Sequence, residues 1–385
     1  MNICIITNGY PANSQDYQGA FCHSFAVALR NSGHNVYIFT PDKDAKKEEN
    51  DNMRVFWLPW LGGKKSLINL SFFNPLDLIK IGSLIAGGKR SIIEYCKNNK
   101  IDFCLALWAL PSGYFAMHTK KKLGIPYAVW CLGSDINMYA KYPVIKNIIK
   151  TVLQNANALY ADGIQMSEDV KKISHRDCEF LSTTRILPKI QINVSDVDRN
   201  KKNFVFIGRL EYIKGIDILI EAMRLLLYKK ECENMSLYVF GSGSQEEYVN
   251  KKIIEYGLET FVFFKGYANQ DDVSRYLQQC DWCIIPSRSD SIPVVFSESL
   301  QSNTPLIVCD VGDMGYLVRK HKVGFAARPN NPESLAETII STLTLGADDY
   351  LGYTKNIPFL AQEFNIENTV KKFIFQAQEL VKKNI

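Results

Sequence analysis

The sequence predicts an α/β protein made of two Rossmann-like domains, and three observations support this prediction. The chain has 385 residues, of which 46% are hydrophobic, so it is long enough for two domains with separate cores. Short, nearly continuous apolar runs alternate with longer amphipathic stretches through both halves. This alternation is typical of parallel strands that are covered by helices on both faces. A largely polar stretch at 187–203 separates the two halves.

The expected elements follow one another in the same way in each half. In the first half we expect strands at 2–7, 36–40, 55–58, 103–108, 127–131 and 158–161, and helices that include 21–32 and 143–155. In the second half we expect strands at 204–207, 236–240, 262–265, 282–285, 306–309 and 324–327, and helices at 216–228, 245–256, 270–279, 295–301 and 332–343. A last amphipathic helix at 366–383 has no strand after it.

These elements predict a domain organisation and the place of a site. We expect an N-terminal domain over 1–188, a linker over 189–203, a C-terminal domain over 204–363, and a final segment over 364–385 that packs back on the N-terminal domain. Open parallel sheets bind ligands at the carboxyl ends of their strands. Two such sheets facing each other across a cleft would place the segments that follow their strands around one ligand.

The overall charge and the cysteines exclude several classes of protein. A net charge of +5 permits an anionic substrate or membrane surface, but no dense basic stripe predicts a nucleic-acid partner. Most of the ten cysteines lie inside apolar runs, as reduced and buried thiols do, which favours the cytosol. Cys280 and Cys283 form a C-x-x-C pair without a second pair or a thioredoxin-like context, so we interpret them as core residues.

No signal peptide and no membrane-spanning helix are expected. The N-terminus begins with a strand, and no apolar run approaches the roughly 18 residues that a spanning helix needs. The stretch at 76–86 comes nearest but contains Asp77, Lys80 and Gly82, so ordinary helix packing is preferred over contact with a membrane. We therefore expect a cytoplasmic protein, with peripheral contact at the inner face of the cytoplasmic membrane as an alternative.

Two cations follow the first strand of the second half. Gly208 allows the chain to turn after that strand, and Arg209 and Lys214 lie on the loop before the next helix. A planar guanidinium and a compact ammonium together suit a diphosphate, although two solvated loop cations would look the same. Gly241-Ser242-Gly243 follows the next strand, but Glu246 leaves the G-x-G-x-x-G dinucleotide pattern incomplete, and a tight turn before a helix explains it.

The stretch at 284–298 is the most specific in the chain. A buried strand ends at Pro286, a polar loop follows, and Pro293 suits the first turn of a helix. The free backbone N–H groups at the start of that helix would suit phosphate or sugar oxygens. Asp290 on the loop and Glu298 in the helix can face one ligand, while two surface acids would be the plain alternative.

At this point the sequence resembles the C-terminal domain of glycosyltransferase family 4. The stretches at 204–215, 237–243, 262–267, 281–298 and 304–308 carry the resemblance in order, and 19–34 and 133–136 extend it more thinly into the N-terminal half. Members of this family have the GT-B architecture and move a sugar from a nucleotide donor with retention of anomeric configuration. The resemblance implies a UDP-, GDP- or ADP-sugar as co-substrate and no separate cofactor.

The resemblance also implies roles for individual residues. Arg209 and Lys214 match the pair that holds the donor diphosphate, and Asp290 and Glu298 match the E-x7-E pair that binds the transferred sugar and the ribose. These four are the expected catalytic residues. The expected donor site further includes Gly19, Gly208, Gly241, Tyr267, Ser287, Ile292, Pro293 and Val294, and Asp135 is a weaker candidate near the sugar or the acceptor.

Two positions depart from the family pattern. The first acid of the pair is Asp290, one methylene shorter than glutamate, and Ser291 follows it where glycine is common. Leu132 stands where many members carry a histidine that contacts the donor sugar. Both departures concern the identity of the transferred sugar.

No essential metal and no strong protein base are expected. Asp42-Lys43-Asp44 and Asp196-Val197-Asp198 match the D-x-D pattern of metal-dependent glycosyltransferases only in letters, because both lie in polar stretches away from a defined site. The expected reaction is transfer to a glycan or lipid-linked acceptor in the synthesis of a bacterial surface polysaccharide or glycoconjugate. A nucleotide-sugar epimerase of the same fold and a non-catalytic nucleotide-sugar-binding subunit are the alternatives.

Overall fold

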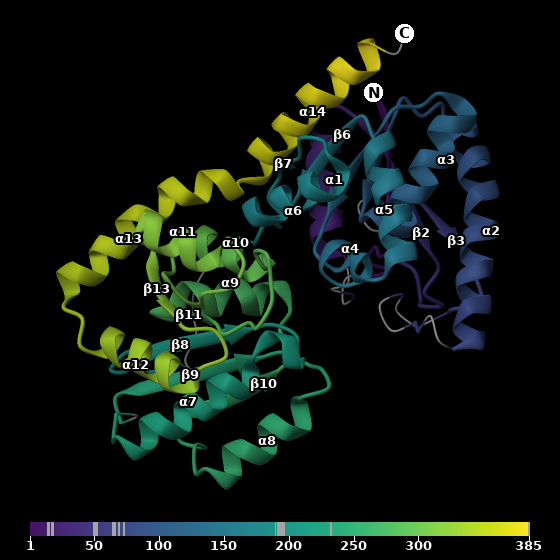
Figure 1. Cartoon of the computed structure of the whole chain (residues 1–385). Helices are drawn as coiled ribbons and strands as arrows, with labels where there is room; N and C mark the ends of the chain where they lie inside the picture. Colours follow the sequence, from purple (N-terminus) through teal and green to yellow (C-terminus); the bar gives the residue numbers. More distant parts are fainter. Residues whose placement is uncertain are drawn as a thin grey trace. The chain divides into compact units, whose positions relative to one another are not determined.

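The computed structural model describes residues 1–385 except 14–15, 17–18, 49–52, 64–66, 68–69, 72–73, 189, 191–196, 232 and 384–385. The chain forms two compact units (Figure 1). Unit 1 contains Met1–Ser182 together with Ile366–Ile385, and unit 2 contains Thr183–Asn365. The predicted boundaries at 188, 203 and 363 stay predictions, and residues 189 and 191–196 of the predicted linker lie outside the described residues.

Unit 1 is built on a parallel sheet whose strands are ordered β3-β2-β1-β4-β5-β6-β7. The strands are β1 (Asn2–Ile6), β2 (Asn35–Pro41), β3 (Arg54–Leu58), β4 (Phe103–Leu107), β5 (Tyr127–Cys131), β6 (Ala158–Ala161) and β7 (Glu179–Phe180). Every residue of β4, β5 and β6 is buried, as expected for strands that are covered on both faces.

Helices cover both faces of the unit 1 sheet. On one face, α2 (Pro75–Asn98), α3 (Tyr114–Leu123), α5 (Pro143–Asn155) and α6 (Ile164–Ser174) enclose one hydrophobic core. On the other face, α1 (Ala20–Asn31) and α14 (Ile366–Lys382) enclose a second core, in which Phe373 contacts the rings of Phe25, Phe103 and Tyr160. The short helix α4 (Ser134–Asn137) follows β5.

Unit 2 repeats this plan with the strand order β10-β9-β8-β11-β12-β13, all parallel. The strands are β8 (Lys202–Ile207), β9 (Met235–Phe240), β10 (Val262–Gly266), β11 (Trp282–Ile285), β12 (Leu306–Cys309) and β13 (Gly324–Ala327). Its helices are α7 (Ile216–Tyr228), α8 (Glu246–Glu255), α9 (Gln270–Gln279), α10 (Val294–Gln301), α11 (Met314–His321), α12 (Pro332–Leu343) and α13 (Ala347–Ala361).

The predicted fold class is confirmed, since the chain contains two parallel α/β sheets of seven and six strands. Strand order reverses between β1 and β4 in unit 1 and between β8 and β11 in unit 2. At such a switch point the loops that follow the two neighbouring strands diverge and leave room for a ligand. In unit 2 these are the loops that carry Lys214 and Asp290.

The cysteines agree with their interpretation as core residues. Cys280 and Cys283 are buried, and so are most of the other described cysteines. In the described part of the chain no helix is both long enough and apolar enough to cross a membrane.

Candidate active site

The central contact of the candidate site joins the two loops at the switch point of unit 2. Lys214 ends the short 3₁₀ turn Tyr212–Lys214 after β8, and Asp290 lies on the loop between β11 and α10. The Lys214 Nζ atom donates to both carboxylate oxygens of Asp290, at 2.7 and 2.8 Å. The two side chains are only 16% and 18% exposed, so water screens this ion pair less than one on an open surface.

Arg209 lies on the same loop as Lys214 but differs from it in exposure and in pairing. Its side chain is exposed, and among the described residues it makes no hydrogen bond or ion pair. The site therefore holds one cation that is already neutralised and one that is free to bind an anion. Both stand on the segment that follows β8.

Arg288 was not predicted as a site residue, yet it holds this loop in place. Its guanidinium donates to both carboxylate oxygens of Asp217, at 2.7 and 2.6 Å, and to the backbone oxygen of Tyr212 at 2.6 Å. The guanidinium also lies 3.7 Å from the centre of the Tyr212 ring. A bidentate pair combined with stacking is a geometry that lysine cannot reproduce. Arg288 thus fixes the turn that presents Lys214 to Asp290.

Glu298 also has a partner that the sequence did not reveal. Its carboxylate is 2% exposed and accepts a hydrogen bond from Nε of Arg185. Gln301, one helical turn further along α10, donates to the Arg185 backbone oxygen at 2.8 Å and accepts from the Leu187 backbone N–H at 3.3 Å. The segment before the predicted linker is therefore attached to α10, and the charge of Glu298 is compensated before any ligand binds.

The glycines after β8 and β9 permit a close approach of two loops. A Cβ atom on Gly241 would lie 1.9 Å from the backbone oxygen of Gly208, and one on Gly243 would lie 2.6 Å from that of Leu210. Both glycines have φ near +150°, which side chains rarely tolerate. The G-x-G sequence is thus explained by packing against the loop that carries Arg209.

Gly215, which follows Lys214, is expected to be a sensitive position. It has φ +69°, and a Cβ atom there would lie 2.0 Å from the backbone oxygen of Pro286. We expect Gly215→Ala to lower the free energy of unfolding by about 2 kcal/mol or more, from left-handed strain plus overlap. In a unit of this size that corresponds to a fall of about 4–8 °C in Tm, measurable by calorimetry. Gly257→Ala is the control, because Gly257 has φ +68° but no atom within 4 Å; equal losses would contradict the overlap.

The start of α10 provides backbone donors beside Asp290. The sequence predicted that Pro293 lies in the first turn of this helix. In the structure Pro293 is the residue before the helix, and Val294 is its first residue. Proline has no N–H group, so only the amides of Ile292, Val294 and the residues that follow can donate to a ligand. Ser287 and Ile292, on the loop between β11 and α10, are buried, while Tyr267, after β10, is exposed.

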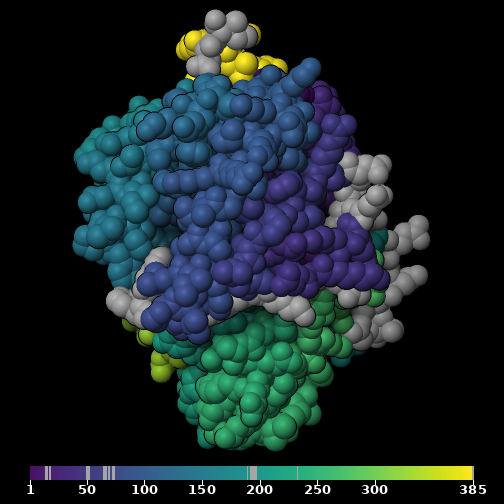
Figure 2. Space-filling model, turned by 90° about the vertical axis from the view of Figure 1, so that its right-hand side faces the viewer, coloured from purple at the N-terminus to yellow at the C-terminus, as the bar shows by residue number. Residues whose placement is uncertain are grey.

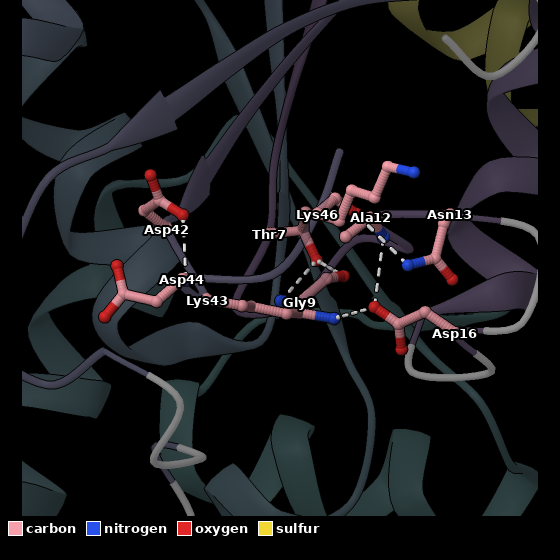
Figure 3. A network of polar contacts seen from close by, with 9 residues as sticks. All are labelled: Thr7, Gly9, Ala12, Asn13, Asp16, Asp42, Lys43, Asp44 and Lys46. Carbon is pink, nitrogen blue, oxygen red and sulfur yellow. Dashed lines mark hydrogen bonds and ion pairs between the residues drawn. The ribbon is translucent and has the colours of Figure 1, made fainter. Parts of the chain in front are cut away.

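In unit 1, Gly19 allows two parts of the loop between β1 and α1 to approach each other closely. Gly19 has φ +85°, and a Cβ atom there would lie 2.4 Å from the backbone oxygen of Gly9. The same loop is attached to the segment after β2 (Figure 3), because Asp16 accepts from Nζ of Lys43 at 2.9 Å and from the Ala12 backbone N–H at 3.0 Å. This close approach accounts for glycine at position 19 within unit 1, and the predicted role of Gly19 toward the donor stays a prediction.

Asp135 lies at the carboxyl edge of the unit 1 sheet but points into the protein. Its carboxylate is fully buried and accepts from the backbone N–H groups of Ala109, at 2.8 Å, and Leu132, at 3.4 Å. Burial raises the pKa of this carboxyl above its ordinary value. In this arrangement Asp135 joins the loops that follow β4 and β5, and its role toward sugar or acceptor stays a prediction.

The two D-x-D sequences show no metal site within the described residues. Asp42 forms an ion pair with Lys47 at 2.6 Å and accepts from the Asp44 backbone N–H at 3.0 Å. Asp196 lies outside the described residues. No group of three or more His, Cys, Asp or Glu side chains in the described ranges is arranged to hold a metal ion.

Two doubly wound parallel sheets, with a cation and a carboxylate at the switch point of the second, are the architecture that GT-B proteins share. The family model described as Glycosyl transferases group 1 matches residues 189–357. Over this segment the chain matches glycosyltransferase family 4, a family that uses nucleotide sugars. The sequence-based identification of the family is therefore confirmed.

Three similar proteins illustrate the match. An uncharacterized glycosyltransferase of Methanocaldococcus jannaschii is 23% identical over 373 residues, which cover 87% of each chain. The poly(glycerol-phosphate) alpha-glucosyltransferase of Bacillus subtilis is 25% identical over 60% of this chain and 34% of its own length, so this chain spans about a third of it. The structure of Anabaena HepE in complex with UDP-glucose has 17% identity and a TM-score of 0.72, covering 99% of this chain and 100% of that one. The last likeness concerns the fold.

Proposed function

We propose that this glycosyltransferase moves a sugar, with retention and without a metal ion, from a nucleotide-sugar donor to a glycan or lipid-linked acceptor. The observation that carries the proposal is the contact between Lys214 and Asp290 beside the unpaired Arg209, at the switch point of unit 2. Two cations suit the diphosphate of a nucleotide sugar, and a carboxylate next to them suits the hydroxyl groups of the sugar that the diphosphate carries.

The proposed chemistry follows from where charge develops. When the anomeric C–O bond breaks, the sugar becomes electron-poor and the departing diphosphate gains negative charge. Arg209 and Lys214 would stabilise the diphosphate, and preorganised groups of this kind contribute about 2.7–4 kcal/mol each. Asp290 would exchange part of its contact with Lys214 for hydroxyl groups of the sugar, and Glu298 would accept from the ribose. In a retaining reaction the donor phosphate can take the proton of the acceptor hydroxyl.

The similar proteins guide the choice of donor and acceptor. HepE has been solved with UDP-glucose, so uridine sugars are the first donors to test. The Bacillus subtilis relative glucosylates a poly(glycerol phosphate), a polymer that repeats anionic phosphates. We therefore propose that the acceptor belongs to the synthesis of a bacterial surface polysaccharide or glycoconjugate, and that the enzyme works in the cytoplasm at the inner face of the membrane.

A ligand panel tests the proposed function directly. Binding to the native state raises apparent stability, by about 2.7 kcal/mol when a ligand is present at a hundred times its Kd. We expect one of the UDP-, GDP- or ADP-sugars to raise Tm and the matching sugar to be transferred with retained anomeric configuration, read by NMR. A donor that is epimerised without any acceptor, or no response to any nucleotide sugar, would contradict the proposal.

Transfer is expected to be independent of divalent metal. In the proposed reaction Arg209 and Lys214 would neutralise the diphosphate in place of a metal ion. We expect initial rates with the responsive donor to be unchanged by an excess of EDTA. Loss of activity on chelation, followed by recovery on adding magnesium, would show that the cation pair is insufficient.

A further inference from the structure

The net positive charge of the protein arises within one segment of unit 1. Between positions 72 and 161 the sequence has eleven Lys and Arg residues against four Asp and Glu. The whole chain has 45 and 40, so 34 basic and 36 acidic residues remain elsewhere. The entire positive excess therefore belongs to this segment, which contains α2, α3 and α5.

These three helices lie on the same face of the unit 1 sheet. All of them contribute to one hydrophobic core, α2 contacts α3, and α3 contacts α5. Figure 1 shows them side by side within unit 1, and Figure 2 shows this face with the segment of α2 and α3 in blue at the front. We call the outward surface of α2, α3 and α5 the basic layer.

The lysines of the basic layer are largely unpaired. Lys141, Lys146 and Lys150 flank or belong to α5, and no described acidic group forms an ion pair with them. From 136 to 161 the sequence contains no Asp or Glu. On the neighbouring helix, burial and the positive charges of Lys89, Lys122 and Lys121 lower the pKa of His118.

Large apolar side chains are exposed on the same layer. Each crossover helix runs from the carboxyl edge of the sheet back to its amino edge, so α2 and α5 both begin at the carboxyl edge. The exposed apolar residues gather at these two beginnings. They are Leu76, Leu78 and Ile79 on α2, and Met138, Tyr142, Val144 and Ile148 on or just before α5, with Val144 74% and Leu76 67% exposed.

We propose that the basic layer binds the surface of an anionic lipid bilayer, with the apolar side chains at the beginnings of α2 and α5 inserted among the headgroups. Lysines next to exposed aliphatic and tyrosine side chains are the composition of interfacial helices, and each lysine near an anionic surface adds to binding. A protein partner with an acidic face would match the charge of the lysines but would not account for the aliphatic side chains that are exposed to solvent. The proposal rests on the proposed function in one respect only, which is that the acceptor is bound to a membrane.

Vesicle binding tests the proposal independently of transfer. We expect the purified full-length protein to co-sediment with vesicles of equimolar phosphatidylglycerol and phosphatidylcholine, and not with phosphatidylcholine alone. Raising the salt from about 0.05 M to about 0.5 M should weaken binding, because the Debye length shortens. Binding that ignores lipid charge, or no binding to the anionic vesicles, would overturn the proposal.

Matched variants locate the surface. Replacing Lys141, Lys146 and Lys150 with glutamine should lower the partition coefficient at least about tenfold. The control replaces Lys229, Lys251 and Lys355, three exposed lysines of unit 2, with glutamine and should bind as the wild type does. Equal losses in the two triple variants would overturn the assignment to the basic layer.

A second pair of variants tests the apolar contribution. Val144→Ser with Ile148→Ser should reduce binding, while Ile254→Ser with Leu351→Ser, exposed positions of unit 2, should not. If the first pair instead converts a dimer into a monomer in solution and leaves vesicle binding unchanged, a second copy of the chain covers this surface and the proposal is wrong. The donor should raise Tm in every variant. A variant without this rise in Tm would contradict the proposed function, but it would not contradict membrane binding.

Discussion

Lys214→Met is expected to lower kcat/KM for the true donor by at least about tenfold, and Arg209→Met by a similar factor. A hydrogen bond to a charged group is worth about 1.5–3 kcal/mol, and tenfold corresponds to about 1.4 kcal/mol. The loss at Lys214 should be the larger of the two. Without the ammonium, the carboxylate of Asp290, which now accepts from Nζ at 2.7 and 2.8 Å, faces the incoming diphosphate uncompensated.

A double variant separates the two causes of that loss. Lys214→Met with Asp290→Asn should bind a nucleoside diphosphate more tightly than Lys214→Met alone, because the repulsive carboxylate is gone. Transfer should stay low, since the proposed contact with the sugar is also lost. Titration calorimetry with UDP, GDP and ADP measures the first effect and steady-state kinetics the second. Wild-type kinetics in both single variants would contradict the diphosphate assignment.

Arg185→Met is expected to lower the free energy of unfolding by about 3 kcal/mol. The change leaves the carboxylate of Glu298 buried, at 2% exposure, without its guanidinium partner. Removing one member of a buried ion pair typically costs about 3–5 kcal/mol, whereas removing both members costs much less. We therefore expect Arg185→Met with Glu298→Gln to be less destabilised than the sum of the single variants.

Urea unfolding of the four proteins gives this double-mutant cycle. Arg319→Met is the matched control, because Arg319 pairs with Asp310 at 2.9 Å where both side chains are exposed. Exposed pairs contribute about 0–1 kcal/mol, so the control should lose little. A loss at Arg185 no greater than the loss at Arg319 would show that Glu298 does not depend on its buried partner.

Much of the fold could be predicted because its strands are apolar on both faces. The ranges 127–131, 158–161, 282–285, 306–309 and 324–327 match observed strands from end to end. Two-residue β7 could not be predicted, because a pair of residues has no periodicity. Helix packing was expected only over 76–86, whereas α2 extends over Pro75–Asn98.

The candidate site was predictable where ligand chemistry dictates the residue type. Lys214 and Asp290 stand after neighbouring strands, and the structure brings them together because β8 and β11 meet at the switch point. Arg288 and Arg185 could not be predicted in the same way. Their partners, Asp217 and Glu298, are 71 and 113 residues away in the sequence, and no local pattern connects them.

The return of the chain to unit 1 has a consequence for synthesis on the ribosome. Unit 2, Thr183–Asn365, is continuous in sequence, but unit 1 needs Ile366–Lys382 to complete one of its two cores. Domains fold as units while the chain emerges from its N-terminus. Most of unit 1 is translated before unit 2, but unit 1 can complete its fold only after unit 2 has been translated. Until Val370 and Phe373 emerge, the side chains of Phe25, Phe103 and Tyr160 lack part of the core that covers them.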